Sequence, residues 1–145
     1  MQTNEQLITP HVEKAEDTAS LDTNDSSIQI EKILQDLHSV SDDILLSLVT
    51  TWDGLTISTH NNLSNNDDQT MAAMTSELLS VSKRSAQALE SGDVNEMLLH
   101  CSKNNILLMP SGSIVVLALI TKPDINLGLL FIEARRAAQA VAGAF

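Results

Sequence analysis

Residues 44–59 read ILLSLVTTWDGLTIST, and this stretch decides the class of fold. Its first part, residues 44–50, is apolar at almost every position and too short for a core helix, which predicts a strand covered on both faces. Asp53-Gly54 is a strong tight-turn signal, and the alternating residues 55–59 predict a second strand nearer a sheet edge. We therefore expect a β-hairpin with a central first arm and a peripheral second arm.

Upstream of this hairpin, the chain divides into a polar tail and a helix. Residues 1–27 hold six acids against a single lysine and contain Pro10. Such a composition buries too little apolar area to order itself, so we expect a flexible acidic tail, either a solvated spacer or a regulatory docking segment. Ser26 followed by Gln29 resembles a capping box, and helical apolar spacing then predicts a first helix over about residues 28–39.

A longer helix is expected downstream, over residues 69–90. Asp67 or Asp68 is placed to cap it, and Gly92 is placed to end it. Its apolar residues form two adjacent stripes, which together are wider than one sheet contact requires. The excess indicates a second protein surface or a broad contact with its own sheet. One stripe consists of Met71, Met74, Leu78 and Val81, and the other of Ala72, Leu79, Ala86 and Leu89.

Three strands and a helix complete the chain. Strands are predicted over residues 94–101, 106–109 and 114–120, and the last of these is again apolar throughout and therefore central. Asn126 is expected to cap a final helix that reaches at least Val141.

The order of elements predicts the architecture. Short turns between most strands favour a mainly antiparallel sheet, and two strands that are apolar on both faces require helices above and below. We expect an α/β (α+β) fold with the order α-β-β-α-β-β-β-α, in which a five-stranded sheet forms a three-layer α/β/α sandwich. Residues 28–145 are expected to form this single domain.

Composition excludes several classes of partner. The 145 residues carry a net charge of −11 and only 2% aromatic residues, so nucleic acid and anionic lipid surfaces are not expected partners. The longest apolar run, residues 114–120, is too short to insert into a membrane. A lone cysteine, Cys101, and an N-terminus without a signal-peptide pattern favour a cytoplasmic protein without a disulfide.

The sequence holds no recognisable catalytic or cofactor site. Its histidines are single and show no metal-binding spacing, and the motifs for acyl transfer, nucleotide hydrolysis and dinucleotide binding are absent. His100 and Cys101 are neighbours on a predicted strand and therefore point to opposite faces, so they do not form a nucleophile and base pair. We expect a protein that is not an enzyme and needs no metal or cofactor.

Trp52, the only tryptophan, stands beside the predicted turn. There it either offers a contact for a partner or lies flat over neighbouring strand residues.

Three local patterns, in this order, match a known family. They are Trp52-Asp53-Gly54-Leu55 after an apolar strand, Leu108-Met109-Pro110-Ser111-Gly112 before the strand at 114–119, and Asn126-Leu127-Gly128-Leu129-Leu130. Over residues 28–141 the chain resembles the roadblock family, of the dynein light chain roadblock type, whose fold is also profilin-like.

The resemblance implies a function as well as a fold. Roadblock proteins form homodimers in which the third strands pair into one sheet with the second helices beside them, which here implies residues 94–101 and 69–90. Bacterial and archaeal members commonly regulate Ras-like small GTPases, whereas eukaryotic members are dynein light chains or scaffolds. An edge strand and a surplus apolar stripe agree with such an interface. The residues expected at the dimer or partner interface are Met71, Met74, Leu78, Val81, Val94, Met97 and Leu99.

Three functions remain open at this stage. The first is a homodimeric, non-catalytic regulator or scaffold of a Ras-like small GTPase. The second is a structural adaptor whose binding is indifferent to guanine nucleotide. The third, a small-molecule sensor or enzyme on a profilin-like scaffold, requires polar groups that converge on a pocket, and the sequence shows no such group.

Overall fold

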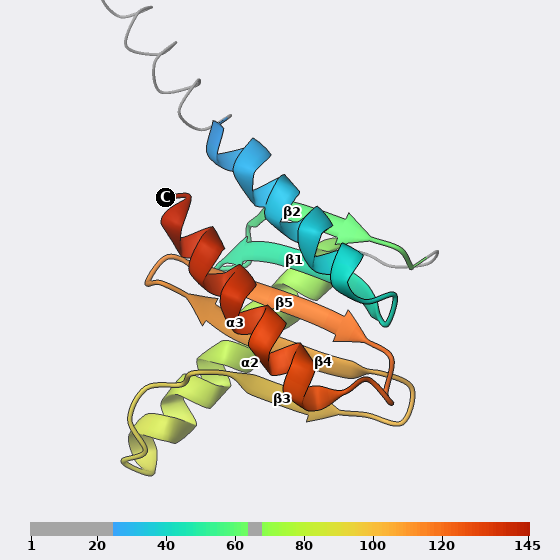
Figure 1. The fold of residues 1–145 in the computed structure, drawn as a ribbon. Coiled ribbons are helices and arrows are strands. Elements are labelled where there is room, and N and C mark those ends of the chain that lie inside the picture. Colours follow the sequence, from blue (N-terminus) through green and yellow to red (C-terminus); the bar gives the residue numbers. More distant parts are fainter. Residues whose placement is uncertain (1–24, 64–67) are drawn as a thin grey trace, which may run out of the picture.

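The computed structural model describes residues 25–63 and 68–145. In this part of the chain a helix occupies residues 25–40 and is followed by seven further elements. They are β1 (Ile44–Thr51), β2 (Thr56–Asn61), α2 (Asp68–Ala88), β3 (Met97–His100), β4 (Asn105–Ser111), β5 (Val115–Thr121) and α3 (Leu127–Gly143) (Figure 1). The predicted order of elements is confirmed. The expected acidic tail lies, apart from its last three residues, outside the described chain.

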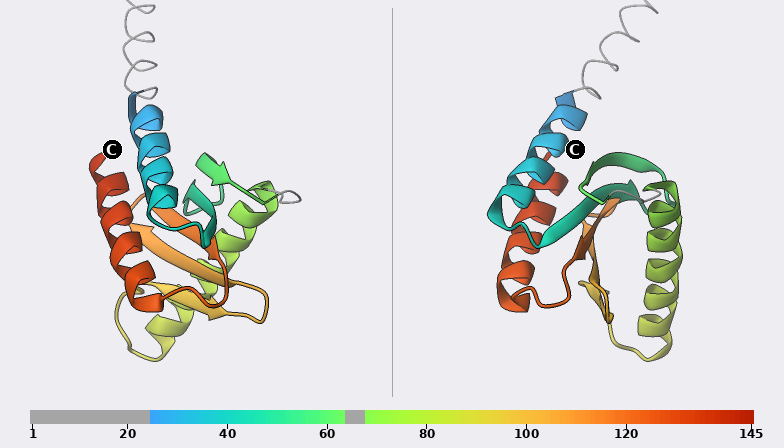
Figure 2. Two further views of the ribbon diagram at one scale, coloured as in Figure 1. Left: turned by 45° about the vertical axis from the view of Figure 1, so that its right-hand side comes forward. Right: turned by 90° about the vertical axis from the view of Figure 1, so that its right-hand side faces the viewer.

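The strands form one antiparallel sheet in the order β2-β1-β5-β4-β3. As predicted, β1 is an inner strand and β2 an edge strand, while β5 is central and buried along its whole length. Figure 2 shows the layers: the N-terminal helix and α3 cover one face, and α2 covers the other. The three-layer α/β/α sandwich is therefore confirmed.

Strand alternation builds a separate core on each face. Val49, Leu117 and Leu119 point to the face that packs against the N-terminal helix and α3, together with Leu34 and Leu130. The residues between them on β1 and β5 point to α2 instead: Leu46, Leu48, Val116 and Ala118 meet Met71, Ala72 and Leu79. The continuous apolar runs in the sequence follow from this double coverage.

The N-terminal helix begins earlier than its apparent capping box. Residues 25–27 are already helical, so Ser26 is not the cap that the sequence predicted. Its hydroxyl instead donates to the carbonyl oxygen of Ala144 at 2.9 Å, joining this helix to the end of α3. At α3 the prediction is correct, since Asn126 accepts a hydrogen bond from the amide of Leu129.

The end of α2 also differs from the prediction. Glu90, not Gly92, ends the helix: it adopts the left-handed conformation with φ of 53°, while the amides of Glu90 and Ser91 donate to the carbonyls of Gln87 and Ala86. This is the Schellman pattern, which glycine usually completes.

The third strand is shorter and the fourth longer than predicted. In the register that joins Met97 to Leu108, residue 95 would lie opposite Pro110, which has no amide hydrogen to donate. Pairing of β3 with β4 therefore stops at Met97, whereas β4 continues to Ser111 against β5. Proline is tolerated at position 110 because β3 does not extend that far, so no backbone carbonyl of β3 needs an amide hydrogen there.

Candidate dimer and partner-binding surface

The two halves of α2 have different surroundings. The helix crosses the sheet diagonally from β1 and β2, and its last turns reach past β3 (Figures 1 and 2). Its buried residues are Met71, Ala72, Thr75 and Leu79, and no residue of α2 after Leu79 is buried. The second half of α2 therefore covers little of its own sheet.

One flank of α2 carries apolar side chains that are not buried. Met74 is 44% exposed and Val81 is 51% exposed, and Leu78 between them is half-buried. On the same flank, the Ser82 hydroxyl lies 3.0 Å from the sulfur of Met97, so this flank faces the side of the sheet where β3 lies. Of the expected interface residues on α2, the structure buries Met71 in its own core and leaves the other three on this flank.

β3 is the open edge of the sheet on that side. The amide of Cys101 donates to the carbonyl of Asn104, so this pair is hydrogen-bonded, and antiparallel strands alternate bonded and non-bonded pairs. The backbone groups of Leu98 and His100 therefore point away from β4, towards the open edge. Met97 and Leu99 are half-buried on the face of α2, while Val94 precedes the strand. We call the exposed flank of α2 (Met74, Leu78, Val81) together with β3 the edge surface.

A groove lies under the second half of α2 at the end of the sheet. It has a volume of about 850 Å³ and draws its lining from the β1–β2 turn, α2, the segment before β3 and the β4–β5 turn. Trp52 packs against the core on the α2 side, and the Lys83 ammonium lies 5.3 Å from the centre of its ring. Trp52 is half-buried against this core and also lines the groove, so both interpretations from the sequence stay open.

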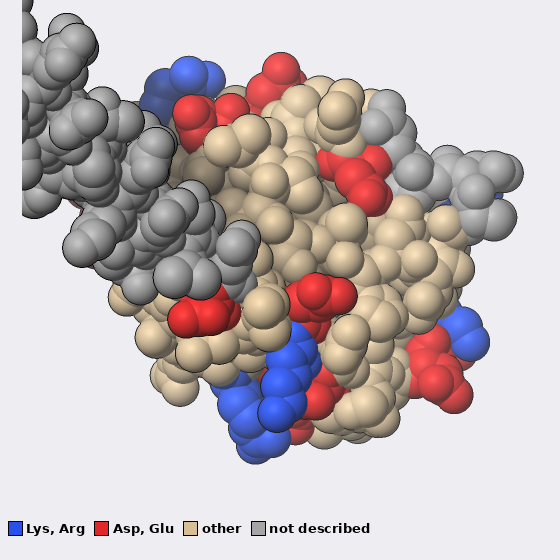
Figure 3. Space-filling view, turned by 90° about the horizontal axis from the view of Figure 1, so that it is seen from above, with Lys and Arg blue, Asp and Glu red and all other residues tan. Residues whose placement is uncertain are grey.

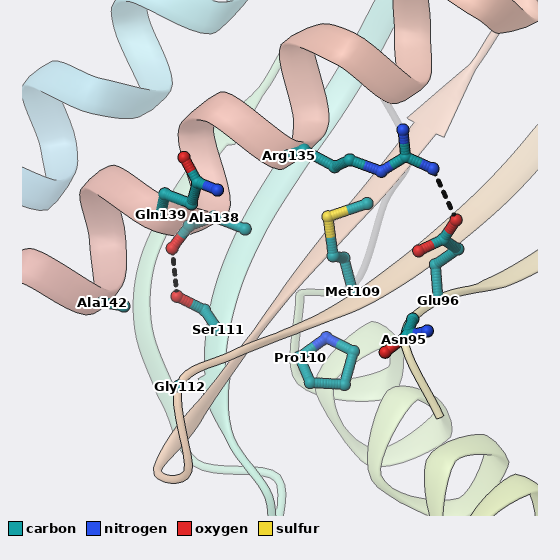
Figure 4. Close-up of a pocket in the computed structure, with 10 residues that line it drawn as sticks. All are labelled: Asn95, Glu96, Met109, Pro110, Ser111, Gly112, Arg135, Ala138, Gln139 and Ala142. Carbon is teal, nitrogen blue, oxygen red and sulfur yellow. Dashed lines mark hydrogen bonds and ion pairs between the residues drawn. The ribbon is translucent and has the colours of Figure 1, made fainter. Parts of the chain in front are cut away.

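A second groove, of about 400 Å³, lies between α3 and β4 (Figure 4). Two interactions within the groove occupy several of its polar groups. Arg135 binds Glu96 at 2.9 Å, and the hydroxyl of Ser111 donates to the carbonyl of Ala138. A serine whose proton is held by a carbonyl oxygen has no adjacent base, so this groove lacks the arrangement that activates a nucleophile.

A pair of histidines is packed between the N-terminal helix and the β1–β2 hairpin. The ring of His38 stacks on that of His60 with 4.0 Å between ring centres, and its Nε2 lies 2.8 Å from the hydroxyl of Ser47. Burial lowers the pKa of His38 to about 4, and the neighbouring charge of His60 contributes in the same direction. His38 is therefore a neutral packing residue above that pH.

The remaining chemistry expected from the sequence can be located in the described chain. The ring of His100 is bonded to the side chain of Asn105, and Cys101 is exposed beyond the end of β3. Within residues 25–63 and 68–145, no three or more His, Cys, Asp or Glu side chains gather in a way that could hold a metal ion. No helix in this same part is long and apolar enough to cross a membrane.

Charge is distributed unevenly over the surface. Seen from above, the molecule is largely uncharged, with acidic side chains spread across the face and basic ones towards its margin (Figure 3). This pattern fits the net charge of −11 and offers no extended basic patch in that view.

Comparison with known proteins identifies the family. Residues 29–121, from the N-terminal helix to the end of β5, match the model of the Roadblock/LC7 domain. The chain belongs to the Roadblock/LC7 domain family. The resemblance of the sequence to roadblock proteins is thereby confirmed, while no curated protein matches the chain in sequence.

Solved structures agree on the fold of this Roadblock/LC7 domain. MglB of Myxococcus xanthus superposes with a TM-score of 0.75 at 18% identity, over 81% of this chain and 87% of that one. A Roadblock/LC7 domain from Streptomyces avermitilis gives 0.72 at 20% identity, over 78% and 94%. A chain of the LokiProfilin1/rabbit actin complex gives 0.57 at 12% identity, over 80% and 96%, which extends the likeness to profilins.

Proposed function

We propose that this Roadblock/LC7 domain forms a homodimer through its edge surface, and that the dimer is a non-catalytic regulator or scaffold of a Ras-like small GTPase. The observation that carries the proposal is the coincidence of an unpaired edge strand with an apolar helix flank on the same side of the molecule. Each feature alone is common, but together they leave backbone hydrogen-bonding groups and apolar surface exposed side by side.

A two-fold axis normal to the sheet satisfies both features at once. It pairs β3 with the β3 of a second copy in antiparallel fashion, through the outward backbone groups of Leu98 and His100. The two sheets become continuous, and both α2 helices lie on one face, where Met74 and Val81 leave water. The overhanging turns of α2 then cover the second copy.

The assignment of the partner rests on family membership. Bacterial and archaeal roadblock proteins commonly bind Ras-like small GTPases, and MglB is among the structures with the same fold. The paired α2 helices give the dimer a broad surface for such a partner. The described chain offers no metal-binding cluster, and the Ser47 hydroxyl that contacts His38 is fully buried, out of reach of a substrate. We therefore propose that the protein acts by binding and performs no chemistry of its own.

Partner capture tests this proposal. The immobilised protein is exposed to source-cell extract with GDP or with a non-hydrolysable GTP analogue, and bound proteins are identified by mass spectrometry. We expect a Ras-like GTPase to be retained preferentially in one nucleotide state, and we expect its loss when Val81→Glu disrupts the edge surface. Ser80→Glu is the control, since Ser80 is an exposed residue of the same turn outside the apolar flank.

The alternative outcome favours the adaptor. Equal recovery of some other protein with both nucleotides, still dependent on Val81, would keep the dimer but replace the GTPase with a partner indifferent to nucleotide. Equal recovery of partner proteins by the wild type and by Val81→Glu would show that the edge surface is not needed for binding.

A further inference from the structure

We propose that the groove under the second half of α2 is an intramolecular docking site for residues 5–14 of the same chain, which read EQLITPHVEK. These residues lie outside the described part. The inference concerns the monomer and does not depend on the proposed dimer or on its partner.

The groove is large enough to take the apolar side chains of a short segment. Its volume of about 850 Å³ falls within the roughly 300–1,000 Å³ range of sites that enclose a ligand. Apolar side chains from separate segments converge on it, namely Trp52, Val94, Pro110 and Ile114. Ile114 is 58% exposed at the tip of the β4–β5 turn, so its side chain is available to a docked segment.

Charges at the groove complement the proposed segment. Lys83 lies against the Trp52 ring and, among the described residues, makes no ion pair with a carboxylate. Asp53 and Asp93 stand on the other parts of the lining. In residues 5–14 the apolar Leu7, Ile8 and Val12 are bracketed by Glu5 and Glu13, and Lys14 follows. A glutamate can therefore reach Lys83 while Lys14 meets one of the aspartates.

The N-terminal helix begins at the end of the sheet where the groove lies. The Ser26 hydroxyl donates to the carbonyl of Ala144, which caps the C-terminal end of α3, and a Cβ added at Gly112 would lie 3.6 Å from the Cβ of Ala142. Gly112 in turn lines the groove. Only ten residues, 15–24, are needed as a connection, and fully extended they span up to about 35 Å.

Because residues 5–14 are joined to the domain by a short linker, even a weak interaction is enough to keep them in the groove. A segment joined by a short linker has an effective concentration of about 1 mM, so it occupies its site even when the separate peptide binds poorly. Occupation by the tail would place it beside α2, so an external peptide that enters the same groove must displace it.

Trp52 is the only tryptophan of the chain and lines the groove, so its fluorescence reports occupation directly. The experiment measures acrylamide quenching and the emission maximum of the full chain and of Leu7→Ser/Ile8→Ser. We expect quenching to rise by about twofold or more, with a shift to longer wavelength, because the tethered segment leaves the ring. Ala15→Ser/Ala19→Ser is the matched control in the connecting residues and should leave both readings unchanged.

Two further measurements locate the contact. In the Ile114→Ser background, which changes an exposed residue of the groove, the effect of Leu7→Ser/Ile8→Ser should disappear. A synthetic peptide of residues 1–24, added to the Leu7→Ser/Ile8→Ser protein, should restore protection of Trp52 saturably, whereas the peptide with serine at positions 7 and 8 should not.

The proposal is overturned if Trp52 responds equally to the Leu7→Ser/Ile8→Ser and the control substitutions. It is also overturned if protection of Trp52 follows protein concentration and not the tail sequence, because a second copy of the domain would then cover the groove. Protection that appears only with an added partner protein would assign the groove to that partner.

Discussion

The two long helices on opposite faces of the sheet differ in how they use their apolar residues. α3 buries one face over nearly its full length, with Leu130, Ala134, Ala137, Ala138 and Val141 against the sheet. α2 buries no residue after Leu79 and leaves Val81, and Leu89 just past its end, in water. α3 thus contributes to the core along nearly its whole length, whereas the turns of α2 after Leu79 leave apolar surface free for the proposed contact with a second subunit.

The largest expected effect is a difference in unfolding free energy between substitutions on the buried and on the exposed face of α3. Leu130→Ala removes a fully buried side chain of α3 and should lower the free energy of unfolding by about 2–5 kcal/mol. Ile132→Ala, two residues away but 54% exposed, should change it by about 0.5 kcal/mol or less. Urea unfolding followed by circular dichroism measures both. Similar losses for the two variants would contradict the description of α3.

Acid should lower the stability of the layer formed by the N-terminal helix and α3, because His38 lies in it. The pKa of His38 in the fold is about 4, below its ordinary value of 6.5, so between these values the unfolded chain binds a proton that the folded chain excludes. This contribution to stability is fully present above pH 6.5 and is lost as the pH falls towards 4. Its size should be about 2 kcal/mol, reduced from the full shift by partial solvent screening.

The comparison of wild type with His38→Gln isolates this contribution. Glutamine can still bond to the hydroxyl of Ser47 but does not titrate, so the difference in unfolding free energy between the two proteins should change between pH 6.5 and 4. His60, which stacks on His38, remains present in both. A difference that stays constant over this range would mean that His38 is not protected from protonation.

The smallest expected effect concerns the end of α2. Glu90 holds a left-handed backbone that costs a side-chain-bearing residue about 1 kcal/mol, so Glu90→Gly should stabilise the protein by about 0.5–1 kcal/mol. Glu77→Gly, on the exposed middle of the same helix, should instead destabilise it by about 1 kcal/mol. Thermal unfolding of the two variants should show shifts of opposite sign. Two shifts in the same direction would rule out the helix end described here.

Sequence patterns predicted those parts of the fold that depend on local periodicity. The continuous apolar runs at β1 and β5, the Asp53-Gly54 turn and the Asn126 cap each follow from neighbouring residues alone, and all were found. The length of β3 could not be read in this way. It depends on the register that sets residue 95 opposite Pro110, and a register exists only once the strands have paired.

The candidate surface was predictable only in part. The surplus stripe on α2 is visible from helical spacing, but its division into a buried Met71 and an exposed Val81 depends on the diagonal path of the helix across the sheet. The shape of the groove around Trp52 could not be predicted from the sequence, since its lining comes from four separate segments. The single tryptophan beside a turn was the one signal in the sequence that pointed to it.

The most direct test of the central claim is the self-association of the full chain, measured by sedimentation equilibrium over a range of concentrations. We expect a dimer for the wild type and for Ser80→Glu. For Val81→Glu we expect the dissociation constant to rise by about 100-fold or more, because a charge would be buried between the α2 helices. A wild-type protein that stays monomeric, or a Val81→Glu dimer as tight as the wild type, would contradict the assignment of the edge surface.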